Sequence, residues 1–170
     1  RRFRVLNQAA AALSTTPDQI LERASASLND LSSARKKIGE LRQRLAAVDF
    51  TRVLAGPFCT MTLADLGARV LKIEPPGGDE ARGMGPFKNG QSLYFASINR
   101  GKESVVLDLK TDAGRDAARA LAEKADVLVE NYRPGTMDRL GLGYESLAEL
   151  NPRLIYASLS GFGQTGPYRD

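Results

Sequence analysis

From residue 47 onward, short apolar stretches alternate with stretches that carry helix signals, and this alternation constrains the fold more than any other feature of the chain. The helix signals include Pro57 near the start of one segment, Gly67 at its end, and Thr111 as the cap of another that runs to about Lys124. Apolar strands joined by helices predict a parallel sheet that is covered on both faces. The predicted strands span residues 47–50, 69–74, 104–109, 126–130 and 153–160.

Two parts of this region depart from the simple alternation. Residues 75–103 are rich in glycine and polar residues, and we expect them to be irregular. The segments MDRLG and YESLAEL are expected to form two short helical turns ahead of the last strand. The predicted fold class is therefore α/β, with a parallel Rossmann-like sheet and flanking helices.

Residues 1–46 follow a different pattern and are predicted to be helical. A first helix is followed by a second helix start, where Thr16 can cap and Pro17 suits the first helical position. Apolar residues recur in the second helix at steps of three, four or seven, which predicts an α-helical hairpin or coiled-coil-like arm. The stretch LSTTPDQILERASASLNDL, within residues 5–46, resembles the helical connector of alanyl-tRNA synthetases. We expect two domains, the helical arm and an α/β domain over residues 47–170.

The net charge of +4 is concentrated at the start of the chain, because residues 1–46 hold nine Lys/Arg against four Asp/Glu. The basic run at residues 35–37 is compatible with a partner or nucleic-acid contact, or with a solvated face of a packing helix. No aromatic residues interleave with these charges, so base stacking has no support and nucleic-acid binding is not expected.

The chain has no histidine and a single cysteine, Cys59. An internal disulfide is therefore excluded, a metal site is not expected, and a reducing cytoplasm is the predicted location. No apolar stretch of about 18 residues is present, so no membrane span is expected. Cys59 falls in the first turn of the predicted helix, where the helix dipole favours a thiolate, but a small buried packing residue is the interpretation we prefer.

The residues that follow the predicted strands indicate a binding site, since ligands of such sheets gather outside the carboxyl ends of the strands. Glycine-rich turns there allow close approach of backbone N–H groups, and guanidinium groups bind phosphate oxygens in pairs. Tyr132 and Phe162 are candidates for packing against an adenine ring. The turn TRVLAGP lacks G-x-G-x-x-G, which argues against a usual dinucleotide site. The basic residues of these turns are Arg52, Arg82, Lys110, Arg133 and Arg139.

A structural interpretation of the same residues is equally open. Loops after parallel strands are commonly polar, and Arg133 or Arg139 can instead form surface ion pairs with Glu130, Asp138 or Glu145. The pattern alone gives the two interpretations similar weight.

Residues 47–170 closely resemble the N-terminal part of the family III CoA-transferases, the group of formyl-CoA transferase, carnitine CoA-transferase and α-methylacyl-CoA racemase. The matching stretches are VDFTRVLAGPFCTMTLADLGARVLKIEPPGGD, SLYFASINRGKESVVLDLK and ADVLVENYRPGTMDRLGLGYESLAELNPRLIYASLSGFGQTGP. The resemblance implies an α/β domain that binds coenzyme A across the strand ends, within an interlocked homodimer. No metal is implied.

Position by position, the resemblance implies contacts with three parts of CoA. Pro75 stands where some members place an arginine that contacts CoA, and Arg82 is a possible substitute. Leu54 replaces a polar residue of some transferases, which leaves the substrate open. The implied residues are Leu54 and Ala55 near the CoA, Leu107, Asp108, Leu109 and Lys110 around its adenosine part, and Asn131, Tyr132, Arg133 and Arg139 along its phosphates.

The resemblance also implies an activity for the longer protein: transfer of CoA between an acyl-CoA and a carboxylic acid through an aspartyl intermediate. The aspartate that carries this step in the family lies beyond residue 170, so we expect no catalytic residue within these 170 residues and no turnover by them alone. Alternatives are an acyl-CoA racemase of the same family, or a non-catalytic interaction or RNA-associated protein that uses the basic arm.

Overall fold

A computed structural model describes residues 32–33 and 45–169 of the chain. Ser32 and Ser33 are helical. At Leu45 and Ala46 the helical prediction was wrong, because Leu45 is outside any helix and Ala46 begins the first strand. The remaining residues of the predicted arm, including the cap at Thr16 and Pro17, lie outside the described residues.

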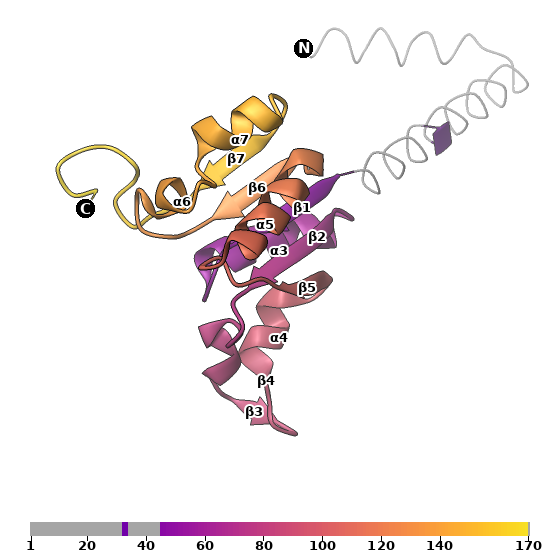
Figure 1. The fold of residues 1–170 in the computed structure, drawn as a ribbon. Helices are drawn as coiled ribbons and strands as arrows, with labels where there is room; N and C mark the ends of the chain where they lie inside the picture. The colour runs from indigo at the N-terminus through magenta and orange to yellow at the C-terminus, as the bar shows by residue number, and fades with distance from the viewer. Residues whose placement is uncertain (1–31, 34–44, 170) are drawn as a thin grey trace, which may run out of the picture. The chain divides into compact units, whose positions relative to one another are not determined.

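Five parallel strands form the main sheet in the order β5-β2-β1-β6-β7. In Figure 1 the arrowheads of β2, β6 and β7 point to the side of the domain on which α6 and the C-terminal segment lie. The register pairs Val48 of β1 with Leu71 of β2 on one side and with Leu128 of β6 on the other. The strands are β1 (Ala46–Asp49), β2 (Arg69–Glu74), β5 (Lys102–Val106), β6 (Val127–Glu130) and β7 (Ile155–Ser158).

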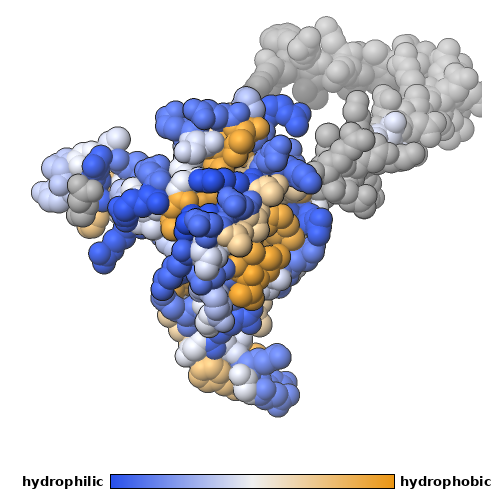
Figure 2. Space-filling model, in the orientation of Figure 1, coloured by the Kyte–Doolittle hydropathy of each residue, from blue (hydrophilic) through white to orange (hydrophobic). Residues whose placement is uncertain are grey.

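Helices cover both faces of the sheet. On one face, α5 and α7 pack with α6 over a core that contains Val48, Leu128 and Leu147. On the other face, α3 packs over Val70 and Val129. In the view of Figure 2 hydrophilic residues cover most of the surface, and hydrophobic residues reach it mainly in the centre, where α5 lies on the sheet. The helices are α3 (Ala55–Asp65), α4 (Leu93–Asn99), α5 (Asp112–Lys124), α6 (Thr136–Arg139) and α7 (Tyr144–Leu150), with a 3-10 turn, η1 (Glu80–Gly83).

The predicted α/β class is confirmed, and several elements begin or end as expected. β2 has the predicted bounds, and the Thr111 hydroxyl oxygen accepts a hydrogen bond from the Gly114 N–H as the cap of α5. The third strand of the sheet, β5, begins two residues before the predicted start and ends at Val106 rather than residue 109. Residues 107–111 instead form a turn that leads into α5, in which the Thr111 N–H donates to the Asp108 carbonyl.

The expectation of an irregular segment over residues 75–103 was wrong. This segment contains η1, a hairpin of β3 (Phe87–Lys88) and β4 (Gln91–Ser92), and α4. The signal for α4 was present in the sequence, since the Ser92 hydroxyl accepts from the Phe95 N–H at the helix start in the manner of an N-cap. Gly90 and Gly101 lie on either side of this short helix, and they made the whole segment look irregular in the sequence.

The strand order places a topological switch point between β1 and β6. The chain moves from β1 outward through β2 to β5, and then returns to the other side of β1 at β6. In open α/β sheets the crevice at such a point, outside the carboxyl ends of the strands, is where ligands bind. The loops after β1 and β6, which begin at Phe50 and Asn131, are therefore the first place to look for a site.

Among the described residues, the structure contains no helix that is both long enough and apolar enough to cross a membrane.

Gly114 allows α5 to approach the turn that precedes it. A Cβ atom at this position would overlap with the carbonyl group of Asp108, which is backbone and cannot move aside. We expect Gly114→Ala to destabilise the fold by roughly 1–3 kcal/mol, because overpacking outweighs the better helix propensity of alanine. Gly77→Ala is the control, since a Cβ there meets nothing within 4 Å. Thermal unfolding of both variants tests this, and equal melting temperatures would contradict it.

Candidate functional site

The loop after β1 is held in a strained conformation. Val53 has a φ of 64°, in the left-handed region that a β-branched residue rarely adopts. Such strain persists only where the surroundings enforce it, and it is concentrated at functional sites. The Tyr94 hydroxyl donates to the Val53 carbonyl at 3.4 Å, and the Val53 N–H lies 3.5 Å from Asp79 Oδ1. The loop, residues 51–54, is thus fixed from the side of β2 and α4.

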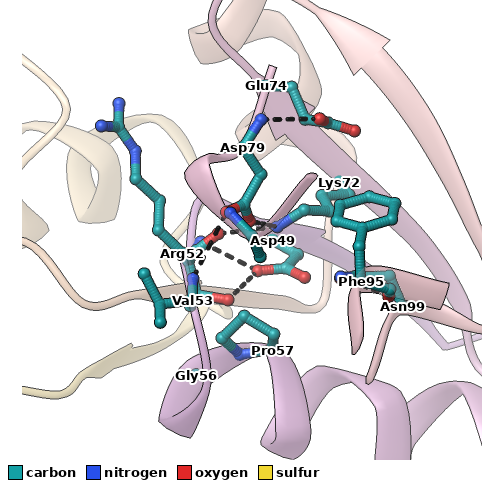
Figure 3. Close-up of polar contacts among 12 residues, drawn as sticks. Asp49, Arg52, Val53, Gly56, Pro57, Lys72, Glu74, Asp79, Phe95 and Asn99 are labelled. Carbon is teal, nitrogen blue, oxygen red and sulfur yellow. Dashed lines mark hydrogen bonds and ion pairs between the residues drawn. The ribbon is translucent and has the colours of Figure 1, made fainter. Parts of the chain in front are cut away.

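Asp49, at the end of β1, is the centre of a buried polar cluster (Figure 3). One carboxylate oxygen accepts from the N–H and the hydroxyl of Thr51. The other accepts from the Thr60 hydroxyl at 2.6 Å and from Lys102 Nζ at 3.0 Å. Lys102 Nζ also donates to the Pro57 carbonyl and to Asn99, so all three of its hydrogens have acceptors. Burial lowers the pKa of Lys102, and the neighbouring Asp49 carboxylate opposes that shift.

Two further ion pairs complete the cluster. Lys72 Nζ lies 2.8 Å from Asp79 Oδ2, and both side chains are almost fully buried. Glu74 is buried and binds the Arg82 guanidinium through both oxygens, each at 2.6 Å. Burial alone would raise the pKa of Glu74, but hydrogen bonds from Arg82, from the Ser104 hydroxyl and from the Asp79 N–H outweigh it and lower the pKa to about 2.

The cluster joins loops that are distant in the sequence. Lys72 Nζ donates to the Thr51 carbonyl at 2.8 Å, which ties β2 to the loop after β1. Asp79 Oδ1 accepts from the Ala81 N–H and caps η1. Sequence reasoning missed these groups, although charged residues inside otherwise apolar strands, such as Asp49 and Lys72, were a visible signal. Across the described residues, no group of three or more His, Cys, Asp or Glu is arranged to hold a metal ion.

Arg82 does not take the place suggested for it beside Pro75. Its guanidinium is bound to Glu74 and lies over the Phe95 ring, 3.9 Å from the centroid. It lines a pocket near α4 together with Gln91 and Ser92, whereas Pro75 lines a different pocket, with Leu107 and Leu109.

The polar residues after β6 bind the loop after β1 through hydrogen bonds and a ring contact. The Asn131 side chain accepts from the Arg52 N–H at 2.8 Å and donates to the Arg52 carbonyl at 2.9 Å, so both of its polar atoms are engaged. The Tyr132 N–H donates to Glu130, and the Arg52 guanidinium lies over the Tyr132 ring, 5.0 Å from the centroid. Burial raises the pKa of Tyr132, and the Arg52 cation partly offsets that shift.

Two adjoining pockets lie at this edge, and Tyr132 lines both. The inner pocket has a volume of about 210 Å³ and the outer pocket about 630 Å³. The inner pocket is lined by Arg52, Ile73, Glu74, Pro75, Leu107, Asp108, Leu109, Lys110, Tyr132, Thr136 and Leu140. The outer pocket is lined by Asn131, Tyr132, Arg133, Pro134, Arg139, Ser160, Gly161, Phe162, Tyr168 and Arg169.

Eight of the ten predicted site residues therefore line one of these two pockets. The other two, Leu54 and Ala55, are exposed at the start of α3 and line neither. Phe162, the second aromatic candidate, is 76% exposed and lines the outer pocket.

Three cations of these pockets, Lys110, Arg133 and Arg139, have no carboxylate partner among the described residues. Within residues 45–169, the side chains of Arg133 and Lys110 form no ion pair or hydrogen bond, and Arg139 donates only to the Thr136 hydroxyl, at 3.0 Å. The surface pairing with Glu130, Asp138 or Glu145 that the sequence left open is therefore absent from this part of the chain. Positive charge without a protein counterion is available to an anionic ligand.

Cys59 is exposed, so its interpretation as a small buried packing residue was wrong. The helix α3 begins at Ala55 rather than near Pro57, which also moves Cys59 out of the first turn.

Comparison with known proteins assigns residues 44–170 to the model described as CoA-transferase family III. The chain is 62% identical over 124 residues to the acetyl-CoA:oxalate CoA-transferase of Acetobacter aceti, and 53% identical over 124 residues to the succinyl-CoA:mesaconate CoA-transferase of Haloarcula hispanica. These matches cover 72% and 70% of this chain but 32% and 31% of the relatives. The chain thus spans about a third of the length of the curated relatives it matches.

A solved structure gives the same result. The CAIB/BAIF family protein from Brucella suis matches with a TM-score of 0.71 and 48% sequence identity, over 74% of this chain and 34% of that chain.

Removing the partner of the buried Glu74 carboxylate should destabilise the fold. We expect Arg82→Met to cost roughly 2 kcal/mol at neutral pH, less than for a fully buried pair because the Arg82 side chain is 46% exposed. The pKa of Glu74 is lower in the folded state than its ordinary value of 4.5, so this stabilisation is present above pH 4.5 and is lost as the pH falls toward 2. The difference between the wild type and Arg82→Met should therefore shrink over that range.

Denaturant unfolding of the wild type and Arg82→Met from pH 2 to 7 measures the loss of stability at neutral pH and its decrease at low pH. Arg69→Met is the matched control, because Arg69 pairs with Glu103 on the surface and both side chains are more than half exposed. An equal loss of stability in the two variants at neutral pH would show that the Glu74 pair is no stronger than a surface pair.

Proposed function

Because this chain belongs to CoA-transferase family III, we propose that it forms the CoA-binding part of an enzyme that transfers CoA between carboxylic acids. The observation that carries the proposal is the group of cations without carboxylate partners, Lys110, Arg133 and Arg139, around two adjoining pockets at the switch point of the sheet. A ligand with several phosphate groups and an aromatic base fits both the charge and the walls of these pockets.

In this proposal the inner pocket receives the adenosine part of CoA. Its walls include apolar side chains from two loops, Leu107, Leu109 and Leu140, which suit a flat nucleobase, and the Tyr132 ring offers a stacking surface. Asp108 and Lys110 stand in the turn that connects β5 with α5. The predicted adenosine contacts are thus supported as a group by their common pocket.

The outer pocket receives the phosphates that link adenosine to the pantetheine arm. Arg133 and Arg139 supply paired donors for phosphate oxygens there, and Arg169 adds a third guanidinium to the lining. Asn131 serves this site indirectly, since its side chain is occupied by the backbone of Arg52. Leu54 and Ala55 stay proposed CoA contacts, at the exposed start of α3.

The proposed substrates are an acyl-CoA donor and a dicarboxylic acid acceptor. The names of the relatives support this choice, because one pairs acetyl-CoA with oxalate and another pairs succinyl-CoA with mesaconate. Both relatives are transferases by name, which favours transfer over racemisation. The aspartyl intermediate stays a prediction, and no residue among 45–169 is assigned a covalent role.

We propose that the intact protein is a homodimer, as the resemblance implies. The outer side of α3 supports this, since Leu54, Phe58 and Leu66 are each at least half exposed, and exposed apolar groups of this kind are commonly buried at interfaces. Phe58→Glu should shift the protein from dimer to monomer in sedimentation analysis. A wild type that sediments as a monomer at every concentration would contradict this.

Calorimetric titration with CoA tests the proposed binding site. Arg133→Ala and Arg139→Ala should each weaken CoA binding by roughly 1.5–3 kcal/mol, the usual worth of a hydrogen bond to a charged group. Arg153→Ala is the matched control, because Arg153 is exposed and lies just before the start of β7, at the opposite edge of the sheet. The site is not the one proposed if both variants bind CoA as tightly as the control.

A further inference from the structure

Arg52 lines the inner pocket, and although the sequence counted it among the basic residues after the strands, the resemblance gave it no contact with CoA. We infer that Arg52 binds the phosphate on the ribose of CoA, in the inner pocket, together with Lys110. This inference rests on the proposed function, since it specifies which part of CoA the inner pocket recognises.

The backbone of Arg52 is fixed more tightly than a surface loop requires. Asn131 binds its N–H and its carbonyl at once, and the next residue, Val53, is held at a positive φ. Figure 3 shows the result: the Arg52 side chain points away from the buried cluster around Asp49 and Lys72. A loop that is strained and clamped on both sides presents this one side chain at the switch point of the sheet.

The guanidinium group itself is weakly bound. Its Nε atom is buried without a hydrogen-bond partner among the described residues. Its Nη2 atom lies 3.4 Å from the Tyr132 hydroxyl, and its Nη1 atom lies 3.6 Å from a carboxylate oxygen of Glu80, whose side chain is 68% exposed. These contacts are long, and an exposed pair of this kind contributes little. Each of the two Nη atoms carries two hydrogens, so each has one left for a ligand.

The ribose phosphate is the part of CoA that best matches this position. A phosphate monoester carries between one and two negative charges near neutral pH, so it calls for more than one cation. Arg52 and Lys110 line the same pocket as the apolar walls proposed for adenine, whereas Arg133 and Arg139 line the outer pocket. The ribose phosphate is attached to the nucleoside and enters the pocket with it. The diphosphate continues toward the outer pocket.

The experiment compares CoA with 3′-dephospho-CoA, which lacks only the ribose phosphate, by calorimetric titration of the full chain. Arg52→Gln should weaken CoA binding on the order of ten- to a hundredfold and leave 3′-dephospho-CoA binding nearly unchanged. Arg52→Lys keeps the charge but loses the forked donors, so it should fall between the wild type and Arg52→Gln. Arg153→Gln is the control and should change neither affinity.

The preference for CoA over 3′-dephospho-CoA is the decisive quantity, because a merely structural role for Arg52 would weaken both ligands equally. An equal loss for both ligands, or no loss for either, overturns the inference and leaves the proposed function standing. A wild type that binds neither ligand overturns the proposed function and, with it, the inference. A reduced preference in Arg52→Gln, with an unchanged melting temperature, supports the inference.

Discussion

The structure depends on opposite charges that are buried together around Asp49, the last residue of β1. Lys72 and Lys102 are almost completely removed from water, and each is matched by one buried aspartate, Asp79 and Asp49 respectively. A buried charge without a partner costs several kcal/mol, so these four side chains must come together or the fold is lost. Because they come from the end of β1, the interior of β2, the start of β5 and the loop after β2, their pairing fixes three neighbouring strands relative to one another.

That fixed arrangement determines the conformation of the loop after β1. Lys72 holds the Thr51 carbonyl, and the loop then passes through the left-handed conformation of Val53. On the other side, Asn131 holds both polar groups of the Arg52 backbone. The loop lies between β1 and β6, where the direction of the chain across the sheet reverses. Strain that a free chain would relax is thus maintained at the point where α/β proteins bind ligands.

The charged residues of the domain fall into two classes with different physical roles. The charged residues of the buried cluster pair with one another and form hydrogen bonds, so few of their donors and acceptors are left for a ligand. The second class consists of Lys110, Arg133 and Arg139, which line the two pockets and have no carboxylate partner in the part of the chain that the structure describes. Residue type alone does not distinguish the two classes. Arg82 is an arginine like Arg133, but it belongs to the buried cluster because Glu74 binds it through both oxygens.

The sequence by itself determined the α/β class, the positions of β2 and α5, and the concentration of basic residues after the strands, because these follow from local periodicity and capping. The ten candidate residues came from the family resemblance, and eight of them line the two pockets. The sequence did not determine α4, the exposure of Cys59, or the partners of the charges. Those are decided by contacts between segments as far apart as Arg52 and Asn131, and no local pattern encodes them. Only the tertiary structure brings Lys72 to Thr51 and Arg52 to Tyr132. These contacts show which charged side chains stabilise the fold and which are available to a ligand.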